Sequence, residues 1–146
     1  MNPKYFVIGF FALGIGVLAY EYLKPAEQDP HSVQTTAGIS GAPLVEVKVP
    51  ELSEQAEAGR ALFDANCAAC HGKNAAGQDG VAPPLVHKVY EPNHHSDMAF
   101  QLAAKSGVRA HHWRFGNMPP VEGVSEDEVN LIIEYVRSLQ RANGIL

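Results

Sequence analysis

The stretch CAACHG, residues 67–72, contains the only two cysteines of the chain, and a histidine stands directly behind the second one. Positions i, i+3 and i+4 lie on the same side of a helical turn. The side chains of Cys67, Cys70 and His71 are therefore expected to face the same way. A partner of this segment must use two thiols and one imidazole at this spacing.

A haem satisfies this requirement. Two thiols can form thioether bonds with its two vinyl groups, and the adjacent imidazole can reach its iron. Cys67 and Cys70 are then both consumed, and His71 becomes the fixed axial ligand. The motif thus predicts one covalently attached haem c.

Three other uses of the cysteine pair have less support. A structural zinc site needs four ligands, usually with a second cysteine pair, which this sequence lacks. A thioredoxin-like pair follows a strand in a βαβ unit, whereas Cys67 follows a short amphipathic helical pattern. A simple structural disulfide between Cys67 and Cys70 stays open from the motif alone.

The N-terminal part carries a membrane or export segment. Residues 5–20 form an uncharged apolar run between Lys4 and Glu21. As a helix this run would be roughly 24 Å long, against a hydrocarbon core of about 30 Å. Flanking tyrosines favour a retained anchor, while the small-residue pattern at residues 17–19 fits a cleaved signal. Residues 1–23 are therefore predicted to be a membrane anchor or a signal segment.

The rest of the chain is predicted to lie on the far side of that membrane. With Lys4 on the cytoplasmic side, a single-pass anchor would leave the rest of the chain exported and tethered to the membrane, and cleavage would release it as a soluble protein. Residues 24–50 mix Pro, Gly, Ser and Thr and predict a flexible linker, and residues 51–146 are the folded domain. A net charge of −5 without a basic patch argues against nucleic acid as a partner.

Helix caps and apolar periodicity predict an all-α domain, because no convincing strand pattern separates the helical segments. The clearest helix opens on a Ser-x-x-Glu capping box. The three predicted helices are Ser53 to about Ala65, Ser96 to about Lys105, and Ser125 to about Asn143.

On these residues the chain resembles the class I c-type cytochromes, in their membrane-anchored bacterial monohaem form. The resemblance covers roughly residues 53–144, and the C-x-x-C-H motif is its specific part. The other matches fall in the family's order: Gly59, Phe63, Pro83-x-Leu85, Asn117-Met118-Pro119 and Tyr135. The resemblance implies a small helical bundle around one covalent haem, in which the first and last helices cross at Gly59.

The resemblance also implies the surroundings of the iron. Met118 is the expected sixth ligand, since it matches the family's Met-Pro and lies in a loop before two prolines. Met98 stands near the start of a predicted helix, where methionine is usually core filler. The carbonyl of Pro83 is expected to accept the second ring N–H of the ligating histidine, with Pro84 as the alternative position. Leu85 is expected to pack on the porphyrin.

Three residues just before the methionine loop have two interpretations. One interpretation is that Arg109, Trp113 and Arg114 donate hydrogen bonds to the haem propionates. An equally good one is that they belong to a solvent-exposed loop whose tryptophan is buried in the core. The sequence alone leaves both open.

The remaining histidines are two adjacent pairs, His94-His95 and His111-His112, with His87 nearby. Imidazole binds copper and haem iron, so a copper site or an alternative axial ligand is one interpretation. Polar loop residues are the favoured one. Replacement of Met118 by His111 or His112 as ligand would give a low-potential carrier.

Two filled axial positions leave no open coordination site for oxygen chemistry, so the predicted function is electron transfer and not catalysis. As the resemblance implies, the protein would carry single electrons on the periplasmic side of a bacterial inner membrane, held by a single-pass anchor with the N-terminus in the cytoplasm or soluble in the periplasm after cleavage. It would take them from a membrane electron-donor complex of a respiratory or photosynthetic chain and pass them to a terminal oxidase or another periplasmic acceptor. The alternatives are a haem c subunit of a larger oxidoreductase complex, an open-site haem protein with peroxidase or sensor activity, and a copper-handling protein.

Overall fold

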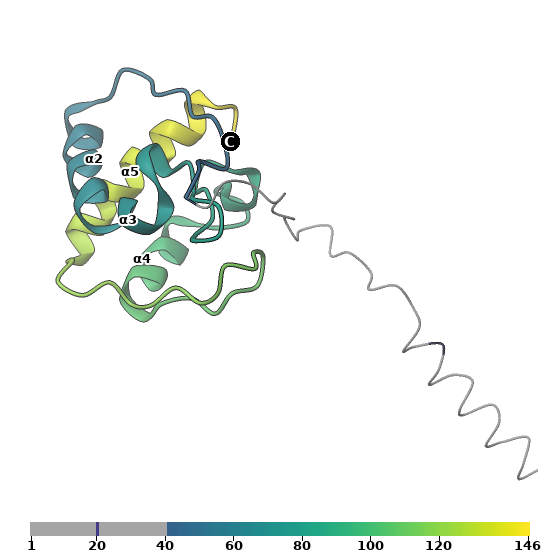
Figure 1. Cartoon of the computed structure of the whole chain (residues 1–146). Helices are drawn as coiled ribbons and strands as arrows, with labels where there is room; N and C mark the ends of the chain where they lie inside the picture. Colours follow the sequence, from purple (N-terminus) through teal and green to yellow (C-terminus); the bar gives the residue numbers. More distant parts are fainter. Residues whose placement is uncertain (1–19, 21–40) are drawn as a thin grey trace, which may run out of the picture. The chain divides into compact units, whose positions relative to one another are not determined.

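The computed structural model of the protein describes residue 20 and residues 41–146 (Figure 1). The predicted anchor over residues 5–20 lies outside the described residues except for Tyr20, and so do residues 21–40 of the predicted anchor and linker. In the part of the chain that is described, no helix is both long enough and apolar enough to cross a membrane.

Helices form the regular structure of residues 41–146, which agrees with the predicted all-α class. No strand occurs in this range, where isolated bridges join Gln78 to Ala82 and Val108 to Met118. The helices are α2 (Glu54–Asn66), α3 (Ala68–His71), α4 (Asp97–Ser106) and α5 (Glu126–Ala142), with short 3-10 helices η1 (Lys73–Ala75) and η2 (Lys88–Tyr90).

The three predicted helices are confirmed as α2, α4 and α5, and their bounds differ from the prediction by about one residue. Ser53 caps α2 by accepting the backbone N–H of Ala56, which satisfies one of the free donors at a helix start. In α5, Ser125 and Glu128 form the predicted capping box. Helix α4 ends at Gly107, whose φ of 73° favours glycine.

The core lies where α2 packs against α5 (Figure 1). Gly59 is buried there, and a Cβ atom at this position would overlap the carbonyl oxygen of Leu131. The two backbones therefore touch. Phe63 of α2 and Tyr135 of α5 are fully buried beside this contact, with ring centroids 5.5 Å apart. The expected helix crossing at Gly59 is thus present.

The segment before α2 is bound to the domain. Lys48 and Asn143 exchange two hydrogen bonds, from Lys48 N to Asn143 Oδ1 and from Asn143 Nδ2 to Lys48 O, of 2.9 and 2.8 Å. Val47 packs against the core. The flexible linker predicted for residues 24–50 is therefore wrong for residues 41–50, because side-chain and backbone partners far along the chain hold that end.

Candidate haem-binding site

A mainly apolar cavity of about 660 Å³ lies between α2, α4, α5 and the long loop that joins the last two helices. This volume is in the range of ligand and cofactor pockets. The residues predicted as site residues from the sequence all line the cavity: Cys67, Cys70, His71, Pro83, Leu85 and Met118.

His71 is held by the backbone of Pro83. The Nδ1 atom of the imidazole lies 2.9 Å from the Pro83 carbonyl oxygen, and a carbonyl can only accept, so Nδ1 carries the proton. Burial lowers the pKa of His71, and the hydrogen bond to Pro83 opposes this effect. The imidazole is thus neutral, and Nε2 keeps its lone pair for a metal. Pro83, not Pro84, is the residue that orients it.

Cys67 is the N-cap of the short helix α3 and Cys70 lies within it, and no disulfide joins the two cysteines. Burial, and to a smaller extent Cys70, raises the pKa of Cys67 to about 11, so this thiol is protonated at neutral pH. The carbonyl groups of this turn are held by Gln78. Its Nε2 atom lies 2.8 Å from the carbonyl oxygen of Ala69, and 3.2 Å from those of Ala68 and Cys70.

Met118 is placed by a closed loop. Its backbone N–H and C=O both bond to Val108, at 2.9 Å each. Within the loop, the side chain of Asn117 accepts the N–H of Ala110. These contacts fix the backbone from which the Met118 side chain reaches the cavity wall. Met98, by contrast, is 63% exposed, so the expectation that it fills the core is wrong.

Trp113 gives the cavity wall a buried donor. The residue is 9% exposed, and its Nε1 atom has no hydrogen-bond partner in the described chain. Its side chain interacts with that of Tyr90, whose pKa is raised by burial and lowered by this side-chain contact. Arg109 and Arg114 are exposed. Of the proposed propionate donors, only the tryptophan is thus a buried residue of the cavity wall.

The histidine pairs meet across two loops. His95, His111 and His112 line the cavity, and the Nε2 atoms of His94 and His112 are 3.2 Å apart. Burial lowers the pKa of His95 most, the hydrogen bond to the Val89 carbonyl raises it, and the neighbouring His94, His111 and Arg137 lower it further. The sequence could not place positions 94 and 112 together.

Two further residues that the sequence did not single out hold the loop between η2 and α4. The guanidinium of Arg137 is buried and donates to the carbonyls of Tyr90 and His95, at 2.8 and 2.6 Å. Gln140, also buried, donates to the carbonyls of Leu85 and Tyr90. No sequence signal marks them, because their partners lie more than 40 residues away.

Comparison with known proteins identifies the class. The sequence model of the cytochrome c family matches residues 56–140, so the chain belongs to the cytochrome c family and carries a covalently bound haem c with iron for electron transfer. The chain is similar to the cbb3-type cytochrome c oxidase subunit CcoP of Rhodobacter capsulatus, with 32% identity over 127 residues. The match covers 84% of this chain but spans only 39% of that subunit's length.

The cavity fits a haem in its donor set. It offers two cysteines that no disulfide joins, a neutral imidazole oriented by a carbonyl, a thioether, and a buried indole N–H. Most of the remaining lining is apolar, as a porphyrin requires.

Proposed function

We propose that the chain is a one-electron carrier whose haem is attached through Cys67 and Cys70, with His71 and Met118 as the axial ligands of the iron. The observation that supports this most strongly is that all four residues line one cavity. Haem c supplies a one-electron change at iron. The remaining tasks of the chain are to hold the ligands and to exclude other reactions.

The two ligands have different effects on the iron. His71 presents Nε2, because its Nδ1–H is donated to Pro83, and this bond also raises the basicity of the ring. Met118 presents a thioether, which favours the reduced iron more than a second imidazole does. With both positions filled, no site is open for oxygen or peroxide.

Met118 is a better candidate than the nearby histidines. Its backbone is fixed on both sides by Val108. The Nε2 atom of His112 already lies 3.2 Å from His94, and His111 is exposed.

In the cell, the carrier would work on the periplasmic side of the inner membrane, held by residues 5–20 with the N-terminus in the cytoplasm, or free after cleavage. It would connect a membrane donor complex with a terminal oxidase or another periplasmic acceptor. A second candidate is a resident haem c subunit of an oxidase complex. The similarity to a subunit of a cbb3-type cytochrome c oxidase supports this second candidate.

The axial ligands can be tested by optical spectroscopy of the haem-loaded protein and of Met118→Ala, with Met98→Ala as the matched control. The wild type and the control should show a far-red band of sulfur bound to ferric iron and no response to carbon monoxide. Met118→Ala should lose the band and bind carbon monoxide. Persistence of the band in Met118→Ala, or binding of carbon monoxide by the wild type, would contradict the proposal.

The two cellular roles differ in how the protein is isolated. A resident subunit should co-purify in constant ratio with oxidase subunits after mild solubilisation. A carrier should separate from them and be reduced and reoxidised by them as a diffusing partner.

A further inference from the structure

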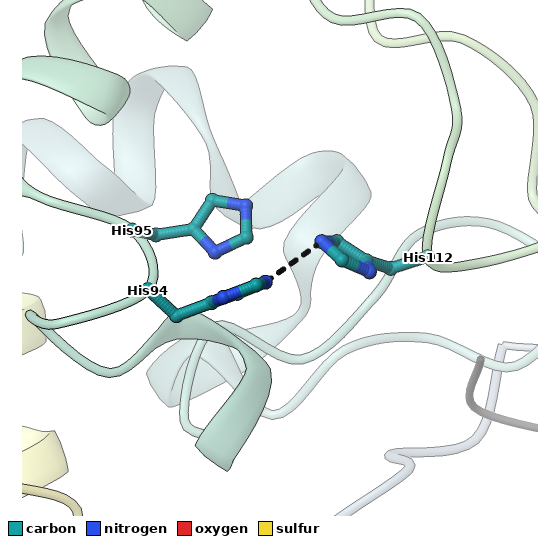
Figure 2. Close-up of side chains that lie close together, drawn as sticks. All are labelled: His94, His95 and His112. Atoms are coloured by element: carbon teal, nitrogen blue, oxygen red, sulfur yellow. Dashed lines mark hydrogen bonds between the residues drawn. The ribbon is translucent and has the colours of Figure 1, made fainter. Parts of the chain in front are cut away.

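Three imidazoles from two loops meet beside the haem cavity (Figure 2). His94 and His95 lie between η2 and α4, and His112 lies in the loop between α4 and α5. One ligand nitrogen from each of the three side chains lies within 4.8 Å of the other two. Figure 2 shows the rings of His94 and His112 edge to edge, with His95 above them.

We propose that His94, His95 and His112 bind one divalent ion of a late first-row transition metal, Zn²⁺ or Cu²⁺, at a site distinct from the haem iron. Imidazole is a common ligand of both ions. Two nitrogens on a tetrahedral Zn²⁺ are about 3.3 Å apart, since each Zn–N bond is about 2.0–2.1 Å. The observed distance between the Nε2 atoms of His94 and His112 is 3.2 Å. Small shifts of His95 would complete a three-imidazole set with water in the fourth position.

The hydrogen bond of His95 supports a role as ligand. Its Nδ1 atom lies 2.6 Å from the carbonyl oxygen of Val89, so Nδ1 donates and Nε2 is left with its lone pair. Histidines that bind metals commonly donate their other ring N–H to a carbonyl or carboxylate in this way. The ring of His111 packs against that of His112, with the two centroids 4.1 Å apart. The Nδ1 atom of His111 lies 2.9 Å from the carbonyl oxygen of Arg109.

The two loops are held in place independently of any ion. The carbonyl of His95 accepts a bond from the buried Arg137. The loop that carries His112 is closed by the bridge between Val108 and Met118, and Trp113 beside it is buried. Binding would therefore require little ordering of the backbone, which favours affinity.

Solvated loop residues explain this arrangement less well. Polar side chains on exposed loops gain little by converging, whereas these imidazoles come from positions 18 residues apart and place ring nitrogens in direct contact. His95 and His112 are also only partly exposed. An ion at this position would take the place of the proton that the Nε2 atoms of His94 and His112 share in their hydrogen bond.

The first test is a calorimetric titration of the haem-loaded full chain, stripped of metal by a chelator, with Zn²⁺. One equivalent should bind to the wild type. His94→Gln and His112→Gln should weaken binding by about 10-fold or more, and the control His31→Ala should not. Absence of saturable binding, or unchanged binding in both cluster variants, would overturn the proposal. A reduced haem spectrum identical to the wild type's verifies the fold of each variant.

A second measurement uses the wild-type protein alone and needs no substitution. Diethyl pyrocarbonate modification, mapped by mass spectrometry, should spare His94 and His112 when Zn²⁺ is present and modify them when it is removed; equal modification in both states would overturn the proposal. Cu²⁺ is tested in parallel, and its electron paramagnetic resonance should show coupling to imidazole nitrogens. Competition between the two ions then gives the preferred one. None of these readouts depends on the axial ligands of the haem.

Discussion

Gly59 and Leu131 meet backbone to backbone where α2 packs against α5, and a Cβ atom on Gly59 would overlap the Leu131 carbonyl oxygen and lie 2.6 Å from its carbon. A carbonyl within a helix cannot move aside as a flexible side chain can. The separation of the two helices therefore depends on this glycine. Phe63 and Tyr135, both fully buried, depend on the same separation for their packing.

We therefore expect Gly59→Ala to destabilise the protein. Alanine should gain up to about 1 kcal/mol of helix propensity, but overpacking typically costs about 1–3 kcal/mol, and a backbone clash lies at or above the upper end. The free energy of unfolding of Gly59→Ala, measured by urea denaturation, should therefore be lower than that of the wild type by about 2 kcal/mol or more. Ala58→Gly, at an exposed position of the same helix, reports the propensity alone. Equal or greater stability of Gly59→Ala would refute the close contact.

Pro83→Ala should change the reduction potential without removing a ligand. Alanine keeps the carbonyl that accepts from His71 but frees the backbone, so the hydrogen bond weakens and the imidazole donates less to the iron. The reduction potential of the haem should rise, because the oxidised iron loses more stabilisation from the imidazole than the reduced iron does. The free energy of unfolding should fall by about 0.4–1 kcal/mol from the flexibility gained by the unfolded chain.

The control for this prediction is Pro50→Ala, at a proline that does not line the cavity. It should lose stability through the same entropy effect and leave the potential unchanged. An unchanged or lowered potential in Pro83→Ala would show that the rigid proline ring is not needed to hold the carbonyl in the position from which it tunes the iron.

The sequence predicted features that depend on neighbouring residues. The caps at Ser53 and Ser125 and the C-x-x-C-H turn are local signals, and they located three helices and the cysteine pair correctly. The attachment of residues 41–50 to the folded domain was not predicted, because it depends on hydrogen bonds between Lys48 and Asn143, which lie 95 residues apart. Long-range hydrogen bonds of this kind leave no periodic pattern in a sequence.

The site shows the same division. The haem-binding residues predicted from the motif and the family resemblance, Cys67, Cys70, His71, Pro83, Leu85 and Met118, all line one cavity, but the residues that support them did not stand out. Gln78 holds the C-x-x-C-H turn from up to 10 residues away, and Arg137 holds the loop of His95 from 42. A glutamine in a loop and an arginine in an amphipathic helix are ordinary surface residues unless the fold is known.

Arg137→Met should be strongly destabilising. The buried guanidinium donates to Asp97, Tyr90, Gln140 and His95, and its loss leaves the His95 carbonyl short of a partner. Each buried polar group left unsatisfied costs about 1–3 kcal/mol, so the free energy of unfolding should fall by roughly 2–4 kcal/mol.

Asp97→Asn is the matched control for the same network. The Asp97 side chain is 67% exposed, and exposed ion pairs contribute at most about 1 kcal/mol. Thermal or urea unfolding of the two variants should therefore separate them clearly. Similar losses in both would mean that the ion pair, and not the bonds to the loop carbonyls, provides the stability.

The capping box of α5 should make stability depend on pH. The backbone N–H and then the hydroxyl of Ser125 donate to Glu128 and lower its pKa from 4.5, against a small opposing effect of desolvation. The unfolded chain thus binds the Glu128 proton more tightly than the folded chain. The stabilisation is complete above the unfolded pKa of 4.5 and is lost as the pH falls through the lower folded value.

Glu128→Gln keeps an acceptor at the same position but cannot ionise. Wild type should therefore be more stable than this variant at neutral pH, and the difference should shrink as the pH falls below 4.5. Urea unfolding followed by circular dichroism at several pH values measures it. Glu122→Gln, at an exposed loop position before the helix, should show no such convergence. A difference for Glu128→Gln that stays constant down to low pH would assign the stabilisation to the shape of the cap and not to its charge.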